Sequence, residues 1–140
     1  MSYGPAPDLQ QAIYAALTGD AELTSLSGGA VFDAMPEGKP EDCFILIGDE
    51  EVRDRSDVSG FGADFLVAIS VIGPSDGFLK IKQIAARVSD LLLNFNPSLA
   101  RGCIGFSHLD RVRARRSTPQ THRRVDLRFR MRVDDITPSN

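Results

Sequence analysis

Few residues of this 140-residue chain are of types that perform chemistry, and their spacing does not group them. Four side chains are of the kinds that bind zinc, and none has the close Cys-x-x-Cys or His-x-x-x-His spacing of a zinc site: Cys43, Cys103, His108 and His122. The acidic run Asp49-Glu50-Glu51 is typical of a solvated strand end rather than of a magnesium site. We therefore expect no bound metal.

Nucleophilic catalysis and nucleotide binding find equally little support. Ser107 adjoins His108, and neighbouring residues of a strand point to opposite faces, so the two do not form a catalytic pair. The glycines of Gly60-Phe61-Gly62 lie between predicted strands, where a hairpin loop accounts for them, and the chain has no phosphate-binding loop. We expect neither an enzyme nor a bound cofactor.

Arginine is the residue type that stands out. Nine of the thirteen arginines lie between Arg111 and Arg132, whereas the chain has only three lysines. Arginine makes planar, bidentate contacts with carboxylates and phosphates and is favoured over lysine at interfaces. Three interpretations stay open: a solvated sheet face, contact with nucleic-acid phosphates, and an interface with acidic protein partners. The last is favoured, because no aromatic residues interleave the arginines as a base-stacking platform requires.

The candidate interface residues are of two opposite charges. The basic set comes from the C-terminal part of the chain: Arg113, Arg115, Arg116, Arg123, Arg124, Arg128, Arg130 and Arg132. The acidic set comes from the N-terminal half and supplies their complement: Asp49, Glu50, Glu51, Asp54 and Asp57. Four of the arginines flank a predicted turn over 117–121, where we expect water to hold them apart in a free subunit: Arg115, Arg116, Arg123 and Arg124.

The charge is unevenly distributed along the chain. Residues 1–76 hold fourteen acids and three bases, a net of −11, and residues 77–140 hold five acids and thirteen bases, a net of +8. Such an asymmetry is typical of nucleic-acid binding, but it equally suits head-to-tail packing in which the acidic side of one subunit meets the basic side of the next. The alternative is that the charges mix in three dimensions.

Apolar periodicity predicts the elements that must position these residues. Helices are expected over 9–19, capped by Asp8, and over 78–94, with one more helical turn around Leu23 and Leu26. Strands are expected over 30–33, 44–52, 63–72, 104–116 and 122–133, with loops over 35–42 and 53–62. The strand over 63–72 is apolar on both faces, which predicts a cover on both sides. The strand over 104–116 alternates irregularly, as a bulged strand does.

The last strand has the cleanest alternation in the chain. One face is apolar, through Val125, Leu127, Phe129, Met131 and Val133. The predicted fold is a single α+β domain over 1–140, in which two main helices pack on one face of a mostly antiparallel sheet that ends in a long C-terminal β-hairpin. Two buried thiols, no secretory signal and no apolar run long enough to cross a membrane predict a protein made in the cytoplasm.

The order of several short motifs resembles the tail-terminator, or tail-completion, family of long-tailed phages, prophages and gene transfer agents. The N-terminal motifs are the helix Leu9–Leu17 followed by Thr18-Gly19-Asp20-Ala21, Leu26, Gly28-Gly29 and Val31-Phe32-Asp33. The later motifs are Gly48-Asp49-Glu50, Gly77-Phe78 with Lys82, Ile84 and Ala85-Ala86, and the closing Arg128-Phe129-Arg130.

The resemblance implies an α+β virion protein that forms a ring, typically a hexamer, at the head-proximal end of the tail tube. Such a ring stops tube polymerisation and presents a surface to the head-completion or stopper protein, while DNA passes through its lumen. Its implied partners are thus other copies of itself, the tail-tube protein and the stopper, without a membrane, and it is assembled in the host cytoplasm. The alternative function is a small nucleic-acid-binding protein that uses the arginine-rich C-terminal hairpin.

Overall fold

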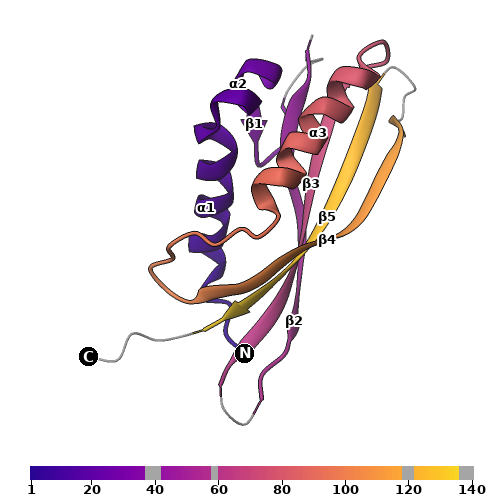
Figure 1. The fold of residues 1–140 in the computed structure, drawn as a ribbon. Coiled ribbons are helices and arrows are strands. Elements are labelled where there is room, and N and C mark those ends of the chain that lie inside the picture. Colours follow the sequence, from indigo (N-terminus) through magenta and orange to yellow (C-terminus); the bar gives the residue numbers. More distant parts are fainter. Residues whose placement is uncertain (37–41, 58–59, 118–121, 136–140) are drawn as a thin grey trace.

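The computed structural model describes residues 1–36, 42–57, 60–117 and 122–135. The chain forms α1 (Ala6–Gly19), α2 (Ala21–Ser27), β1 (Val31–Phe32), β2 (Phe44–Asp54), β3 (Gly62–Pro74), α3 (Phe78–Leu92), β4 (Cys103–Ser117) and β5 (His122–Asp134). Figure 1 shows the long strands crossing the molecule from end to end, with the helices in front of them. The α+β class predicted from the sequence is confirmed.

The described strands form one five-stranded sheet in the order β1-β2-β3-β5-β4. Strands β2, β3, β5 and β4 pair antiparallel, but β1 pairs parallel to β2 through Val31 with Ile45 and Phe32 with Leu46. The sheet is therefore mixed, and the helical turn predicted around Leu23 and Leu26 is the short helix α2. The predicted turn over 117–121 lies largely outside the described residues, although β4 and β5 do pair antiparallel along their length.

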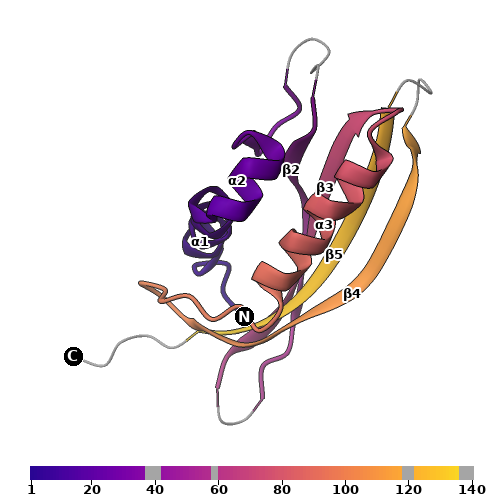
Figure 2. The ribbon, with the colours of Figure 1, turned by 45° about the horizontal axis from the view of Figure 1, so that its top comes forward.

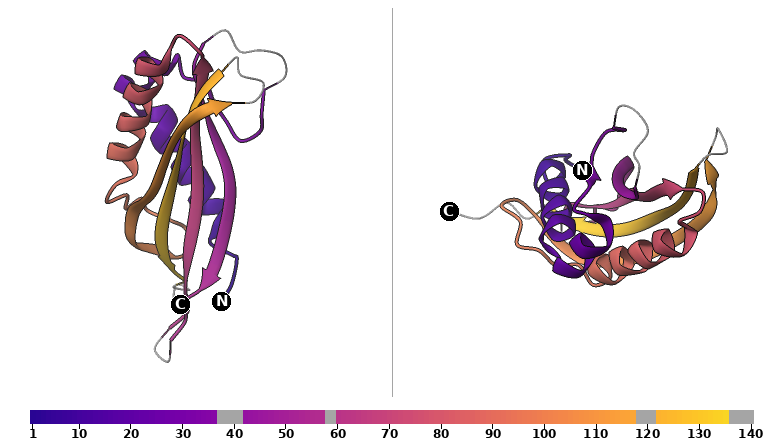
Figure 3. Two further views of the ribbon diagram at one scale, coloured as in Figure 1. Left: turned by 90° about the vertical axis from the view of Figure 1, so that its right-hand side faces the viewer. Right: turned by 90° about the horizontal axis from the view of Figure 1, so that it is seen from above.

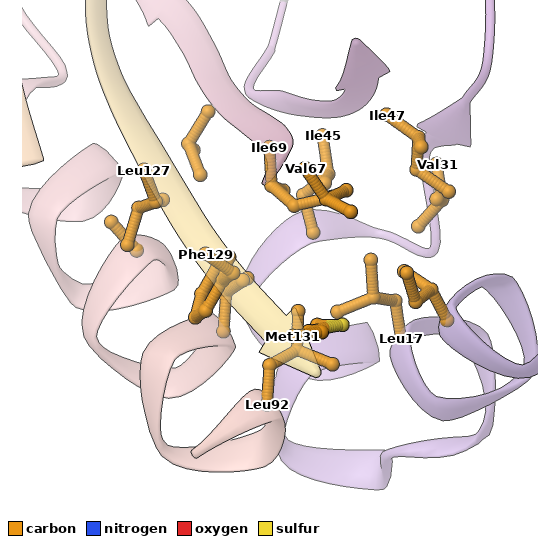
Figure 4. Close-up of a cluster of buried hydrophobic side chains, with 14 of the residues drawn as sticks. Leu17, Val31, Ile45, Ile47, Val67, Ile69, Leu92, Leu127, Phe129 and Met131 are labelled. Atoms are coloured by element: carbon orange, nitrogen blue, oxygen red, sulfur yellow. The ribbon is translucent and has the colours of Figure 1, made fainter. Parts of the chain in front are cut away.

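The helices lie on one face of the twisted sheet, which leaves the opposite face without helical cover (Figure 3). On the helix side, the odd-numbered residues of β5 from Val125 to Val133 are all buried, as their alternation predicted. Phe129 and Met131 pack there with Leu92 of α3 and Leu17 of α1 in one core (Figure 4). Since β5 lies between β3 and β4, it is an interior strand of the sheet, and its apolar face packs against the helix layer.

Strand β3 is buried on both faces, and the second face is covered without a helix. Pairing between β3 and β5 places Arg130 beside Leu66 and Arg124 beside Ile72 on the uncovered side. Both apolar residues are buried. Because the aliphatic stems of arginine cover apolar surface while the guanidinium stays in water, we infer that these arginines shield β3. Of the two covers that an apolar second face predicts, a helix is not present among the described residues, and cover by a partner stays a prediction.

Two helix ends differ from their predicted form. Helix α1 begins at Ala6, after Pro5, so Asp8 lies inside its first turn rather than at its cap. The carboxylate of Asp8 instead accepts a hydrogen bond from the backbone nitrogen of Arg101 at 2.9 Å. Helix α3 ends at Leu92, two residues before the predicted end.

Asp20 fixes the short α2 against α3. Its carboxylate caps α2 by accepting from the backbone nitrogen of Leu23 at 2.9 Å, and it receives two hydrogen bonds from the Arg87 guanidinium of α3 at 2.7 and 2.9 Å. The hydrogen bonds from Arg87, followed by that from Leu23, hold the pKa of Asp20 below its ordinary value. One side chain therefore supplies both a helix cap and a tie between helices.

The two cysteines are free thiols, and only Cys43 is fully buried; Cys103 is partly exposed, so the prediction of two buried thiols holds for the first alone. Burial raises the pKa of the Cys43 thiol. Among the described helices, none has the length and apolar character needed to span a membrane.

Candidate assembly interface

Most of the predicted interface arginines share the uncovered face of β4 and β5. The odd-numbered residues of β5 face the helices, so the even-numbered ones point away, and each β4 residue paired with one of these lies on the same side. We call this surface the arginine face; its arginines are Arg111, Arg113, Arg115, Arg124, Arg128, Arg130 and Arg132. Figure 2 shows β4 as the outermost strand of the sheet beside β5.

The carboxylate of one residue, Asp126, binds the arginines of this face near the end of β4 and the start of β5. Asp126 accepts hydrogen bonds from Arg115 Nε at 3.0 Å, from Arg124 Nε at 2.9 Å and from Ser70 Oγ at 2.6 Å. Burial on its own raises the pKa of Asp126, but these hydrogen bonds outweigh it and hold the pKa below its ordinary value. Arg115 and Arg124 thus share one carboxylate, which reduces their mutual repulsion, and the prediction that water alone holds them apart was wrong for this pair.

Sequence reasoning did not single out Asp126, although a signal was present. It is the one acid that interrupts the arginines along the polar face of β5, between Arg124 and Arg128. A lone acid in such a stripe has cations on both sides along its own strand, and a paired strand adds another. The interruption therefore predicts a local ion-pair centre.

Further along β5, Arg128 and Arg132 each have one carboxylate nearby. Arg128 Nε lies 3.6 Å from Asp110, which is close enough for attraction but too long for a hydrogen bond. Arg132 Nε lies 3.0 Å from Asp134 on the same strand. These groups are partly exposed, so each pair contributes only about 0–1 kcal/mol to stability.

An aromatic residue does lie among the arginines, contrary to the prediction. The guanidinium of Arg130 lies 5.3 Å from the ring centre of Phe106 on β4. The same ring stacks on His108, with 4.6 Å between the ring centres. Since the arginine and the histidine both contact this ring, it is not an open platform for a nucleic-acid base.

Arg116 and Arg123 lie on the other side of the sheet from the remaining arginines. They pair with each other across β4 and β5 and face the helix layer. The Arg123 guanidinium lies 4.8 Å from the ring centre of Phe78, at the start of α3, and the Lys82 ammonium lies 4.6 Å from the same centre. The four arginines predicted to cluster at the tip are thus divided between two faces.

Arg111, Arg113 and Arg116 make no ion pair with a carboxylate of the described residues, and all three are exposed. Arginines that have a carboxylate within the subunit contribute to its fold. Those without one are available to a carboxylate on another molecule. Of the predicted basic set, Arg113 and Arg116 are therefore the residues best suited to an interface.

The predicted acidic residues lie toward the edge of the sheet opposite β4. Among the described strands, β1 pairs only with Ile45 and Leu46 of β2, and no other described strand pairs with this edge of β2, which carries Asp49, Glu50 and Glu51. Asp54 ends this strand and Asp57 follows it, at the end of the molecule away from the β4–β5 tip (Figure 1). Asp54 is close enough to Arg132 of the basic set for their charges to attract, whereas Asp49, Glu50 and Glu51 lie on the edge strand opposite β4.

Some of these acids have partners within the subunit. Glu50 accepts a hydrogen bond from Tyr3 Oη at 2.5 Å, and Glu51 pairs with Arg53 at 3.2 Å. Asp54 accepts from the backbone nitrogen of Ser56 at 2.9 Å, a contact that also contributes to a pKa below the ordinary value. Asp57 bonds through its backbone to Gly60.

The candidates for catalysis and metal binding stay apart in the structure. Ser107 points into the helix side and donates to the backbone oxygen of Leu92 at 2.7 Å, whereas His108 lies on the arginine face. Within the described ranges, no three His, Cys, Asp or Glu side chains gather as a metal site would require. The charged features that remain in the described residues are a strand edge with exposed arginines and a strand edge with exposed acids.

The chain belongs to the family of tail completion protein gp17, whose profile matches residues 11–134. It is also similar to a chain in the solved structure of the virion of a native gene transfer agent (GTA) particle. The two chains are 42% identical, with a TM-score of 0.87, and the similarity covers 95% of this chain and 99% of that one. No curated protein sequence matches. The resemblance inferred from the residue pattern is confirmed, and the chain is a structural tail protein.

Proposed function

We propose that this chain is a tail terminator: it forms a ring, with six copies as the expected number, on the head-proximal end of a tail tube. The ring ends polymerisation of the tube and binds the head-completion or stopper protein, and DNA passes through its lumen. The chain acts in the virion neck, after assembly in the host cytoplasm, and carries out no catalysis. Membership of the tail completion family and the 42% identity to a chain of a GTA virion support this function.

The observation that carries the ring is the separation of charge across the sheet. Strands β1 and β2 form one edge, and β2 holds Asp49, Glu50, Glu51 and Asp54 of the acidic set, whereas β4 forms the other edge and holds exposed arginines. Two different, complementary edges on one subunit favour a head-to-tail contact, and a head-to-tail contact that closes gives a ring. Complementary charge sets the orientation of such a contact more than its affinity.

The two ends of the sheet differ as well, and this suggests contacts along the tail axis. The end of β4 and the start of β5 carry Arg115, Arg116, Arg123 and Arg124, while Asp54 and Asp57 lie at the far end. When subunits pack side by side in one ring, the basic end of one sheet does not meet the acidic end of the next. We infer that the basic end meets the acidic rim of the ring above or below it, from the tube or the stopper.

Deletion of the gene in a particle-producing strain tests the function. Loss of a terminator leaves tube polymerisation unchecked, so electron micrographs should show headless tails of variable, excessive length, and expression of the chain from a plasmid should restore a single length. Tails of normal length joined to heads in the deletion strain would contradict the proposal. Salt-sensitive binding of the isolated monomer to duplex DNA, together with normal tails, would favour the nucleic-acid alternative.

A further inference from the structure

The helix layer leaves a groove at the basic edge of the sheet. Helix α3 packs on β3 and β5, so the helix-facing side of β4 is only partly covered. A hollow of about 250 Å³ lies between α3 and β4, and its walls are almost entirely apolar. We call it the α3–β4 groove; Ala85, Ala86, Val112, Ala114 and Leu127 are among its lining residues, and Lys82 stands at its rim.

The side chains of this groove are unusual for a solvated surface. Val112 is 51% exposed on an edge strand, and Ala86 is exposed on α3. Three of the lining residues are alanines, which leave room for a larger side chain between helix and strand. An exposed apolar groove with small walls suits an aromatic or aliphatic anchor from another protein surface.

The acidic edge offers side chains of the complementary size. Tyr14 on α1 is 47% exposed and Phe32 on β1 is 37% exposed, and both line a second hollow, of about 440 Å³, between α1 and β1. Asp33 lies in the same hollow and is exposed. Aromatic residues are enriched at the centres of protein interfaces because they bury a large area with few rotatable bonds. This edge thus carries bulky side chains and an acid, whereas the other carries small side chains and a base.

The two hollows lie at the same level of the sheet. Strand pairing connects them in one row that runs from β1 to β4: Val31, Ile45, Val71, Val125 and Ala114. Both hollows are also on the helix side, since α1 lines one and α3 lines the other. A second copy placed beside the first at the same level therefore brings its α1–β1 edge to the α3–β4 groove.

We propose that the α3–β4 groove of each subunit receives the α1–β1 edge of the next copy, with Tyr14 as the anchor. Asp33 of that copy then approaches Lys82 at the basic rim of the groove. A second copy fits better than an unrelated protein because the size, the charge and the level of the two edges match within one chain. This inference rests on the proposed ring and identifies its subunit contact.

A pair of variants on α3 tests the contact. Ala86→Glu places a carboxylate in the groove, and Gln83→Glu places the same charge on an exposed position of the same helix that does not line the groove. Both are expected to unfold thermally like the wild type. In the deletion strain, Gln83→Glu should restore tails of one length, whereas Ala86→Glu should leave them as long as in the strain without the gene.

Restoration of normal tails by Ala86→Glu would overturn this contact and leave the terminator function intact. Normal tails in the deletion strain itself would instead overturn the function, so the two failures are distinguishable. Should Ala86→Glu unfold, cysteine cross-linking provides an independent test. Differently tagged Tyr14→Cys and Ala86→Cys chains, mixed on purified tail tubes under mild oxidation, should form a disulfide between chains. No such bond, or one equally strong with Gln83→Cys, would overturn the proposal.

Discussion

The two faces of β5, a strand of thirteen residues, differ in what they contribute to the protein. Its odd-numbered residues, such as Phe129, are buried under the helices, and its even-numbered residues are mainly arginines on the uncovered face. The first face stabilises the fold through the burial of apolar area. The second contributes little to stability, because partly exposed ion pairs are worth about 0–1 kcal/mol each. The comparison shows that one face of this strand stabilises the fold, while the other can change with little loss of stability and is the face on which we propose contacts with partners.

The largest effect is expected from the buried face. Phe129→Ala removes a fully buried ring between β5 and the helices, and should lower the free energy of unfolding by about 3–5 kcal/mol. Chemical denaturation monitored by circular dichroism measures it. Arg130→Ala is the control on the neighbouring residue. It removes the contact with the Phe106 ring and the stem that shields Leu66, and should cost less, about 1 kcal/mol. An equal decrease in the free energy of unfolding for both variants would contradict the difference between the two faces.

A smaller effect is expected on the uncovered face, at Asp126. Asp126→Asn keeps the size of the side chain but removes the charge shared by Arg115 and Arg124, and should cost about 1–2 kcal/mol at neutral pH. Urea unfolding of both proteins under one buffer condition gives the difference. A variant as stable as the wild type would show that the arginines do not depend on this carboxylate.

The same pair of proteins makes a prediction about pH. The pKa of Asp126 is lowered in the folded state, so the charged form contributes stability above the unfolded pKa of about 3.9 and loses it as the pH falls through the lower, folded value. The difference in unfolding free energy between wild type and Asp126→Asn should be constant from about pH 5 to 7 and shrink below about pH 4. A difference that grows in acid would contradict the sign of this linkage.

The unpaired arginines should affect stability least. Arg113→Ser with Arg116→Ser removes guanidinium groups that have no ion pair with a described carboxylate, so unfolding should change by no more than about 0.5 kcal/mol. The proposal nevertheless expects the double variant to fail in assembly, with overlong or headless tails. Normal tails would show that these arginines form only a solvated face.

Salt should act on assembly and leave folding nearly unchanged. The isolated chain is expected to be a monomer or weak oligomer by gel filtration, because polar, complementary edges separate easily, and to form rings on tail tubes. Raising the ionic strength shortens the Debye length from about 8 Å to about 3 Å at 1 M, and should weaken ring formation. A stable hexamer of the isolated chain that persists in high salt would contradict this expectation.

The parts of the fold that follow a strong period could be predicted from the sequence. The alternation of β5 identified its buried face, and the irregular alternation of β4 predicted bulges, which occur between Ile104 and Phe106 and between Leu109 and Arg111. Each bulge shifts the pairing by one residue and so exchanges the two faces. The side occupied by Arg115 or Arg116 therefore depended on bulge positions that a period does not reveal.

Other features depend on contacts between distant segments. A two-residue strand such as β1 has no period, so its parallel pairing with β2 could not be inferred. The pairing of Asp20 with Arg87, and of Asp126 with Arg115, requires the packed fold to bring the partners together. The edge grooves were missed for the same reason, because Ala86 and Tyr14 read as ordinary exposed helix residues until the sheet edges were known.

The location of the chain in the particle tests the central claim most directly. A short peptide tag can be carried at the N-terminus, and purified particles can be labelled with gold-conjugated antibody and imaged by electron microscopy. The account predicts label in a single cluster at the junction of tail tube and head, and at one end only of free tails. Label distributed along the tube, or confined to the end of the tail away from the head, would contradict it.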